Sequence, residues 1–445
     1  MSAGDAARPV WITGIGIVTP IGTGVAAFRA GLRAGRSPVK PIDRFDPSPF
    51  RSRVAAQVDD FDPLDHMEAG VARRLDRFSQ FGLAAGRAAL ADAGLEPGRA
   101  GAADPDRIGI YLGSALGGIA FAEAQHERYL DGGIRTVSPT LALAVFGGAA
   151  PANLGIALDL RGPILSTANS CASGSVALGE ALGAIRAGEI DAAIAGGVEV
   201  PLSPLAFGAF DIIRALSAGR NDDAAAAARP FDAGRDGFVM GEGAALVVLE
   251  AADIARRRGA RPYASLMGYG ATSDAYHMVQ PRADGREAAR AATLALADAA
   301  VEPAEIDYVN AHASSTPIGD VAEARAIRLA LGDRAEVVPV SGTKALYGHP
   351  LGASGAIEAA ICALAIHDGW APGTVNLDMP DAEIAPVLPG LLRDGRPGTY
   401  RRVLSTSFGF GGLNAAVVLG AVEPAGGAGR NYGRRVDRSR TRSAQ

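Results

Sequence analysis

The alternation of short apolar runs with alanine-rich amphipathic segments is the main structural signal in this chain. Runs rich in β-branched residues predict strands in the first half at residues 10–17, 108–112, 164–167 and 192–195. The second half repeats the pattern, with strands predicted at residues 306–310 and 337–340 and a closing hairpin over 403–420. Strands that alternate with helices in this way are typical of a largely parallel α/β fold.

Two predicted helices each follow a strand and a short loop of small residues. Apolar positions recur at helical spacing from Val176 to Ile185, with Gly188 as a stop signal. The same spacing runs from Ile357 to Leu364, with Gly369 just beyond it. Two halves of similar rhythm, meeting near residues 251–264, indicate an internal duplication.

The predicted organisation has four parts. They are a flexible N-terminus at residues 1–9, a first half at 10–260, a second half at 261–421, and a Gly/Arg-rich disordered tail at 422–445. From residue 425 onward the tail carries six arginines against one acidic residue, which is typical of a solvated segment. A contact with an acidic partner is the alternative for this tail.

Composition and charge describe an ordinary globular protein. Hydrophobic residues make up 48% of the 445 residues and charged residues 20%, and the formal net charge of −5 argues against a nucleic-acid surface. The N-terminus lacks the apolar core of a secretory signal, and no uninterrupted apolar stretch is long enough for a membrane span. We therefore expect a cytoplasmic protein.

Cys171 is the leading candidate for a nucleophile. It lies in Asn169-Ser170-Cys171-Ala172-Ser173-Gly174, between a predicted strand and a predicted helix, where the helix N-terminus favours the thiolate. Its small neighbours leave room for a bulky acyl thioester. The alternative is a buried structural cysteine, which is the role we expect for Cys362, on the apolar side of a helix.

Two histidines lie in equivalent positions, each after a strand. His312 stands in Asn310-Ala311-His312-Ala313-Ser314-Ser315-Thr316, and His349 in Gly348-His349-Pro350-Leu351-Gly352. The carboxyl ends of strands are where α/β folds place their sites. Neither loop is specific alone, but both together with the Cys171 loop indicate nucleophilic catalysis.

Other residues near these loops could serve either the site or the structure alone. Lys344 precedes His349 by five residues and could be a loop lysine, and Glu358 could be an ordinary helix carboxylate. Phe408 precedes Gly409-Phe410-Gly411-Gly412, a turn that suits an oxyanion site or a plain hairpin. Gly14-Ile15-Gly16 lacks the third glycine of a dinucleotide loop, and the remaining histidines show no metal-ligand spacing.

Together these motifs resemble the elongating β-ketoacyl-acyl-carrier-protein synthases of the thiolase superfamily, from about Val10 to Gly420. Arg229-Pro230-Phe231-Asp232, Arg235-Asp236-Gly237-Phe238 and Ser273-Asp274-Ala275-Tyr276 add to the resemblance. It implies a duplicated α-β-α-β-α layered fold and a homodimer. It also implies decarboxylative condensation with malonyl groups, no tightly bound cofactor, and substrates carried on the phosphopantetheine of acyl-carrier protein.

The resemblance also implies roles for single residues. Cys171 would carry the acyl group, His312 and His349 would promote decarboxylation, and Lys344 would support His312. Backbone N–H groups of Cys171 and Phe410 would form an oxyanion hole, with Phe410 gating the acyl pocket. Further positions would line the pocket (Leu116, Phe210, Phe408), contact the pantetheine arm (Ser314, Thr316) or hold a monovalent cation (Asn310, Glu358, Ser405).

The sequence departs from the family pattern beside two of these residues. Asn169-Ser170-Cys171 stands where Thr-Ala-Cys is usual, and His312-Ala313-Ser314 where His-Gly-Thr is usual. These changes favour a specialised lipid, polyketide or polyene pathway over housekeeping fatty-acid synthesis. The hydroxyl of Ser314 is retained, so pantetheine binding is expected to be intact.

Three other functions would require different residues at these positions. A thiolase would have a second cysteine in the C-terminal glycine-rich loop, where this chain has Phe410. An initiating or chalcone-type synthase would have an asparagine where this chain has His349. A non-catalytic chain-length partner subunit would lack the nucleophile, and Cys171 is present.

Overall fold

A single continuous sheet organises the protein. The computed structural model describes residues 8–98 and 103–422, so the predicted flexible N-terminus and Gly/Arg-rich tail lie almost wholly outside the described residues. In this part of the chain the sheet has 11 strands in the order β11-β10-β14-β15-β9-β1-β8-β7-β5-β6, with β2 (Gly22–Thr23) paired to β1. The first half contributes β1 (Val10–Thr19), β5 (Ile108–Gly113), β6 (Ile164–Thr167), β7 (Ala192–Glu199) and β8 (Gly243–Ala251). The second contributes β9 (Ala264–Ser273), β10 (Tyr308–Ala311), β11 (Val340–Gly342), β14 (Arg402–Gly409) and β15 (Leu413–Gly420).

The two halves of this sheet have the same topology. From the centre outward, β1-β8-β7 are antiparallel neighbours and β7-β5-β6 are parallel ones. In the other direction, β9-β15-β14 are antiparallel and β14-β10-β11 parallel. The halves meet where β1 pairs with β9. This repeated strand order is the internal duplication that the sequence rhythm indicates.

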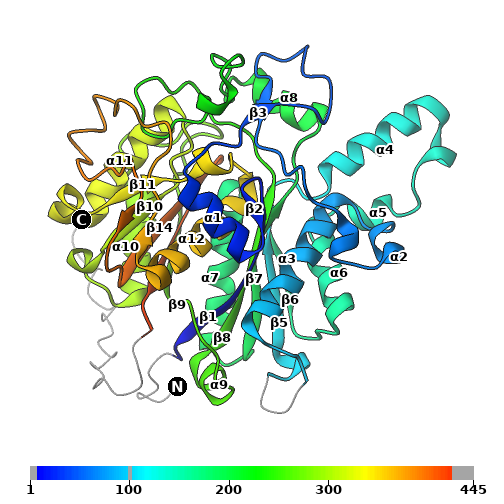
Figure 1. The fold of residues 1–445 in the computed structure, drawn as a ribbon, viewed down its shortest axis with the longest axis horizontal. Coiled ribbons are helices and arrows are strands. Elements are labelled where there is room, and N and C mark those ends of the chain that lie inside the picture. Colours follow the sequence, from blue (N-terminus) through cyan, green and yellow to red (C-terminus); the bar gives the residue numbers. More distant parts are fainter. Residues whose placement is uncertain (1–7, 99–102, 423–445) are drawn as a thin grey trace, which may run out of the picture.

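Helices form three layers around the sheet, and Figure 1 shows them from right to left. On one side α3 (Arg77–Ala93) and α6 (Ala149–Leu158) pack on the first half, and on the other α10 (Arg286–Ala299) and α11 (Pro317–Leu331) pack on the second. Between them lie α7 (Ser173–Arg186) and α12 (Ser354–Asp368), which contact each other and strands of both halves. The predicted layered α/β fold is therefore present, but the expected largely parallel pairing is wrong, because the central strands of the sheet pair antiparallel and only the outer strands of each half pair parallel.

Glycines in equivalent strands let the outer helices approach closely. A Cβ on Gly14 or Gly16 of β1 would overlap the backbone of α3, at Ala89 and Ala85 respectively. A Cβ on Gly268 or Gly270 of β9 would overlap α10 in the same way. Gly14 and Gly16 therefore serve helix-sheet packing, which explains why a glycine pair follows a strand start without a dinucleotide loop.

The middle helix α12 is almost completely enclosed. Within the described residues, the window Leu351–Asp368 is the one helical segment long and apolar enough to cross a membrane, but 83% of it is buried inside the protein. Its neighbours are α7 and the two halves of the sheet. Its apolar character thus reflects its place in the core, and Cys362, which is 0% exposed, belongs to that core as predicted.

Two predicted strands begin later than expected. The segment 337–340 forms a strand only from Val340, because residues Gly332–Glu336 form a 3₁₀ turn and Pro339 lacks an N–H for ladder pairing. The segment 306–310 forms a strand only from Tyr308, since the turn Pro303–Glu305 ends immediately before Ile306. The other predicted strands and the two helices lie where the pattern places them.

Candidate active site

Cys171 lies in the loop between β6 and α7, on a single 3₁₀ turn, Ser170–Ala172, that leads into the helix. Its side chain is 8% exposed. The Nε2 atom of His349 lies 3.2 Å from the sulfur, and the amide of Phe410 also donates a hydrogen bond to it. The turn Gly409-Phe410 is close enough that a Cβ at Gly409 would lie 2.9 Å from the amide nitrogen of Cys171.

Burial sets the protonation state of this thiol. It raises the pKa of Cys171 to about 11, although the Ser170 hydroxyl, the charge of Lys344 and the Phe410 amide act in the opposite direction. The thiolate that the helix N-terminus was expected to favour is therefore not the resting form at neutral pH. The proton must therefore leave the sulfur before or while it forms a thioester.

Alkylation of Cys171 by iodoacetamide is expected to accelerate well into the alkaline range. Because the pKa of the thiol is raised, the reactive thiolate increases above the pH near 8.5 at which an unperturbed cysteine is half ionised. Peptide mass spectrometry over a pH series measures this rate. A rate that reaches its plateau below pH 8 would show that the resting sulfur is already a thiolate.

His312 follows β10 and is held by Lys344. The ammonium of Lys344, 2% exposed, donates to the carbonyl oxygen of His312 and lies 3.2 Å from its Nδ1. It also forms an ion pair with Glu358, which is 0% exposed, so neither residue is the surface side chain it could have been. Because an ammonium can only donate, Nδ1 accepts and the ring proton lies on Nε2.

His349 has a different partner at its Nδ1 atom. Its Nδ1 lies 2.8 Å from the hydroxyl of Ser354, the first residue of α12. With this hydroxyl as donor, the ring proton lies on Nε2, which faces the sulfur of Cys171. Burial and the charge of Lys344 lower the pKa of both histidines well below its ordinary value. Both rings are therefore neutral and present an N–H donor.

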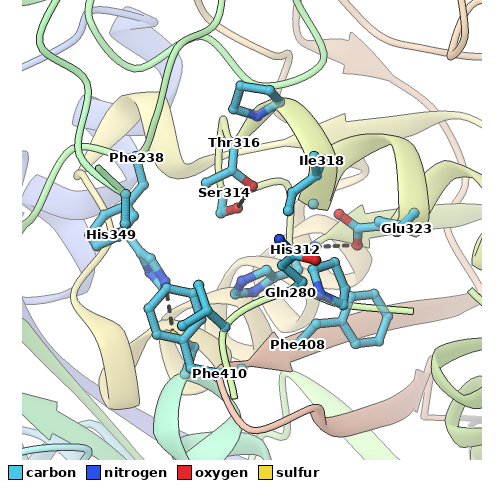
Figure 2. Close-up of a pocket in the computed structure, with 18 of the residues that line it drawn as sticks. Phe238, Gln280, His312, Ser314, Thr316, Ile318, Glu323, His349, Phe408 and Phe410 are labelled. Carbon is cyan, nitrogen blue, oxygen red and sulfur yellow. Dashed lines mark hydrogen bonds between the residues drawn. The ribbon is translucent and has the colours of Figure 1, made fainter. Parts of the chain in front are cut away.

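A buried carboxylate of α11 fixes the His312 loop. Glu323 accepts the amides of His312 (2.7 Å) and Ala313 (2.6 Å), and the Thr406 hydroxyl donates to it at 2.8 Å. Burial raises the pKa of Glu323 to about 7. This contact locks the backbone that carries the histidine, and Figure 2 shows it beside the ring.

Strained backbone marks each of the three loops. Ser170 (φ 52°), Ala313 (φ 39°) and Leu351 (φ 31°) adopt the left-handed region although none of them is glycine. Such residues cost roughly 1–3 kcal/mol each and persist where the surrounding packing imposes them. Ala313 and Ser170 are also positions where the sequence departs from the family pattern, and at Ala313 a side chain stands where that pattern has glycine.

These loops open onto one cavity of about 280 Å³. Cys171, His312 and His349 line it together with Phe210, Phe238, Phe408 and Phe410. Ser314 and Thr316, which are half-buried, also line it, and Figure 2 shows them beside one another. The hydroxyls of Ser314 and Thr316 are 3.0 Å apart. Leu116 lies outside this lining, in the apolar cluster that packs behind Phe210. Phe410 stacks obliquely on Phe210, with ring centroids 5.9 Å apart.

The three residues expected to hold a monovalent cation each carry a buried unpaired polar atom. These are Nδ2 of Asn310, Oε2 of Glu358 and Oγ of Ser405. The oxygens of Glu358 and Ser405 suit a hard monovalent cation, but the unpaired Asn310 atom is an amide nitrogen that cannot ligate one, and Glu358 already has Lys344 as a counter-ion. The cation therefore stays a prediction. No group of three or more His, Cys, Asp or Glu residues that could hold a metal occurs in the described part of the chain.

Two buried acidic residues of the site were not predicted from the sequence. Glu323 shares the buried face of α11 with Asp320, three residues earlier, and this pair of acids among alanines was the available signal. Glu199 ends β7 and accepts the amides of Ala115 (2.6 Å), Leu116 (3.1 Å) and Gly352 (2.9 Å). It therefore ties the loop after β5 to the loop after His349.

A duplicated layered fold, with a cysteine and two histidines in loops of its two halves, defines a condensing enzyme of the thiolase-like class. Family models for the N-terminal and C-terminal domains of β-ketoacyl synthase match residues 7–255 and 263–378. The chain belongs to the β-ketoacyl synthase family, and it is an acyltransferase of the elongating condensing type.

Relatives and solved structures agree with this assignment. The chain is 42% identical to 3-oxoacyl-[acyl-carrier-protein] synthase 2 of Coxiella burnetii, over 93% of this chain and 99% of that protein. It is 40% identical to the enzyme of the same name from Staphylococcus aureus, over 93% and 98%. A β-ketoacyl synthase structure from Burkholderia phymatum superposes with a TM-score of 0.85 at 36% identity, over 94% of this chain and all (100%) of that one. A type II polyketide ketosynthase in complex with its acyl-carrier protein gives a TM-score of 0.85 at 31% identity, over 94% and 100%.

Proposed function

We propose that Cys171 takes an acyl group from the phosphopantetheine of acyl-carrier protein. The sulfur of Cys171 forms the new thioester, the old carbon–sulfur bond breaks, and the cysteine proton passes to the departing pantetheine thiol. The amides of Phe410 and Cys171 stabilise the oxyanion of the tetrahedral intermediate. The contact of the Phe410 amide with the sulfur and the closeness of Gly409 to the Cys171 amide support this role.

The second step uses the two histidines as neutral donors. Malonyl-carrier protein enters, its terminal carbon–carbon bond breaks, and the electron pair remains on the thioester as an enolate while carbon dioxide leaves. Nε2–H of His312 and of His349 hydrogen-bond to the enolate oxygen as negative charge develops. The enolate carbon then attacks the acyl carbonyl, the carbonyl re-forms as the carbon–sulfur bond breaks, and Cys171 departs as a thiolate that takes up a proton from water. The convergence of these three side chains on one cavity is the observation that carries the proposal.

The lining of the cavity and one related structure both support substrates that are bound to a carrier protein. Ser314 and Thr316 line the same cavity as Cys171 and would hydrogen-bond the amides of a pantetheine arm. A related ketosynthase was solved with its acyl-carrier protein. We propose that the reaction takes place in the cytoplasm, with acyl-carrier protein as the partner. We also propose that the first half of the chain ends at residue 260 and that the second half begins at residue 261.

Turnover with carrier-bound substrates tests the proposal. Acyl-carrier protein and malonyl-carrier protein, supplied together, are expected to give a β-ketoacyl product lengthened by two carbons and one carbon dioxide per product. Mass spectrometry of the carrier protein measures the product. Carbon dioxide release without a lengthened product, or no turnover with any acyl group, would contradict the condensation.

A second copy of the chain is the proposed occupant of the sheet edge at β6. Ile164 (45% exposed) and Leu165 (39%) leave this edge strand apolar and uncovered, and Ile156 of α6 beside it is 82% exposed. Such an edge is an aggregation hazard unless it is paired. Sedimentation at twice the mass of one chain is expected, and a monomer at working concentrations would contradict the homodimer.

A further inference from the structure

The serine that precedes the nucleophile contacts the reacting sulfur. Oγ of Ser170 lies 3.8 Å from Sγ of Cys171, a distance at which a hydroxyl and a sulfur atom form a hydrogen bond. Alanine is usual at this position in the family pattern, and alanine has no group that could make this contact. The hydroxyl beside the sulfur is therefore a feature of this chain.

The turn holds the Ser170 side chain in place from two sides. The hydroxyl of Ser173 donates to the carbonyl oxygen of Ser170 (2.6 Å) and accepts the amide of Asn169 (2.8 Å). On the other side, a Cβ at Gly409 would lie 3.0 Å from the Cβ of Ser170. With φ at 52°, the backbone of Ser170 keeps a conformation that residues other than glycine seldom adopt. The side chain is thus confined beside the sulfur.

The hydrogen-bonding partners of the sulfur differ in what they can offer. The Phe410 amide can only donate, and Nε2 of His349 carries the ring proton and donates as well. The Ser170 hydroxyl can donate or accept. A resting thiol has a proton of its own to place. Of these three partners, all in the described part of the chain, the hydroxyl is the one that can accept it.

The charged groups around the sulfur leave the thiolate dependent on neutral donors. Burial raises the pKa of the Cys171 thiol, and the hydrogen bond from Ser170 is the strongest influence that lowers it. The charge of Lys344 also lowers this pKa, whereas the buried carboxylate of Glu199 raises it. Both histidines of the cavity are neutral because burial lowers their pKa. A hydroxyl that turns toward the sulfur therefore stabilises the thiolate where little else does.

Resting on the proposed function, we propose that the Ser170 hydroxyl is a further catalytic group, which accepts the S–H of Cys171 at rest and donates to the thiolate in both steps. During acylation the cysteine proton passes to the departing pantetheine thiol, and the hydroxyl turns about its carbon–oxygen bond to donate to the sulfur. When the carbon–sulfur bond breaks in the second step, the same O–H meets the thiolate before it takes up a proton from water. Serine keeps its own proton throughout.

Two substitutions at Ser170 test this role through alkylation of Cys171 by iodoacetamide. Ser170→Ala removes the hydroxyl and introduces the usual residue of the family pattern, and Ser170→Gly removes it while suiting the left-handed backbone. Both are expected to slow alkylation by about tenfold below the midpoint of the pH profile, and to raise that midpoint by about one pH unit. Peptide mass spectrometry over a pH series measures both quantities.

The reactions with carrier proteins give a second readout. Ser170→Ala is expected to slow acylation of Cys171 by acyl-carrier protein by about tenfold, as measured by intact-protein mass over time. Carbon dioxide release from malonyl-carrier protein, by protein that already carries the acyl group, should stay within about twofold of the unaltered rate. The reason is that the enolate forms beside the histidines and not at the sulfur.

A second serine of the same helix provides the control. Ser175 is 0% exposed in α7, and its hydroxyl lies 2.9 Å from that of Ser407 and not beside the sulfur. Ser175→Ala should leave the alkylation profile and the acylation rate unchanged.

The outcomes separate this inference from the proposed function. An unchanged alkylation profile in both Ser170 variants would overturn the inference. Slower alkylation in Ser170→Ala but not in Ser170→Gly would overturn it too, because it would assign the serine to the backbone of the turn. An equal loss of carbon dioxide release would have the same consequence. Absence of acylation in the unaltered protein would instead contradict the proposed function, while alkylation, which needs no carrier protein, would still report on the hydroxyl.

Discussion

Replacing Cys171 by alanine is expected to abolish acylation of the protein and to lower condensation by on the order of 10⁴-fold or more. The sulfur is the only nucleophile of the described residues that lies within hydrogen-bonding distance of His349 Nε2 and also accepts the Phe410 amide. Alanine removes the atom that forms the thioester and leaves the cavity and both histidines in place. Intact-protein mass spectrometry after incubation with acyl-carrier protein measures the adduct.

The second cysteine provides a matched control for this experiment. Cys362 is 0% exposed in α12, and burial raises the pKa of its thiol far above the ordinary range, so it has no access to an acyl donor. Cys362→Ala is expected to keep full acylation, with a loss of stability typical of a small core truncation, about 1 kcal/mol. An acyl adduct that persists in Cys171→Ala would show that another residue carries the acyl group.

Local sequence pattern was sufficient to place Cys171, His312 and His349. Each follows a short apolar strand and precedes a helix, and these two signals need only neighbouring residues to be recognised. The fold then brings the loops after β6, β10 and β11 onto one cavity, although β6 and β11 lie at opposite edges of the sheet. That convergence is a property of the topology, and it could be expected only through the family resemblance.

Contacts between distant segments could not be predicted in the same way. Glu323, a residue of α11, holds the His312 loop. Glu199 joins two loops that are more than 200 residues apart in sequence. The residues next to them in sequence predict that both carboxylates are exposed, since Glu is rarely buried without partners. The partners are backbone amides, which leave no trace in the sequence. The raised pKa of Cys171 has the same origin, because burial depends on what packs over the loop.

The left-handed backbone conformation of Ala313 could not be predicted from the sequence pattern either. Ala313 stands where the family pattern has a glycine. Its backbone lies in the left-handed region, at φ 39°, with the Glu323 carboxylate accepting its amide. The amide contact holds a conformation that alanine alone would avoid.

His349→Ala is expected to lower carbon dioxide release from malonyl-carrier protein by about 10²–10³-fold and to leave acylation of Cys171 within tenfold of the wild-type rate. The neutral Nε2–H of His349 donates to the enolate oxygen, and its loss leaves His312 as the remaining imidazole donor. Labelled malonyl-carrier protein measures release, and protein mass measures acylation. His126→Ala, an exposed histidine of α4 (Ile119–Gly132), controls for loss of a ring.

The two readouts separate two roles that the geometry allows for this histidine. At 3.2 Å from the sulfur, Nε2 could assist the cysteine in the first step as well as the enolate in the second. Loss of acylation as large as the loss of carbon dioxide release would assign His349 to the cysteine, and an unchanged release rate would remove it from decarboxylation. Ser354→Ala sharpens the distinction: without the hydroxyl on Nδ1, the proton can move to that atom. Carbon dioxide release should then fall by about tenfold, while the histidine ring stays in place.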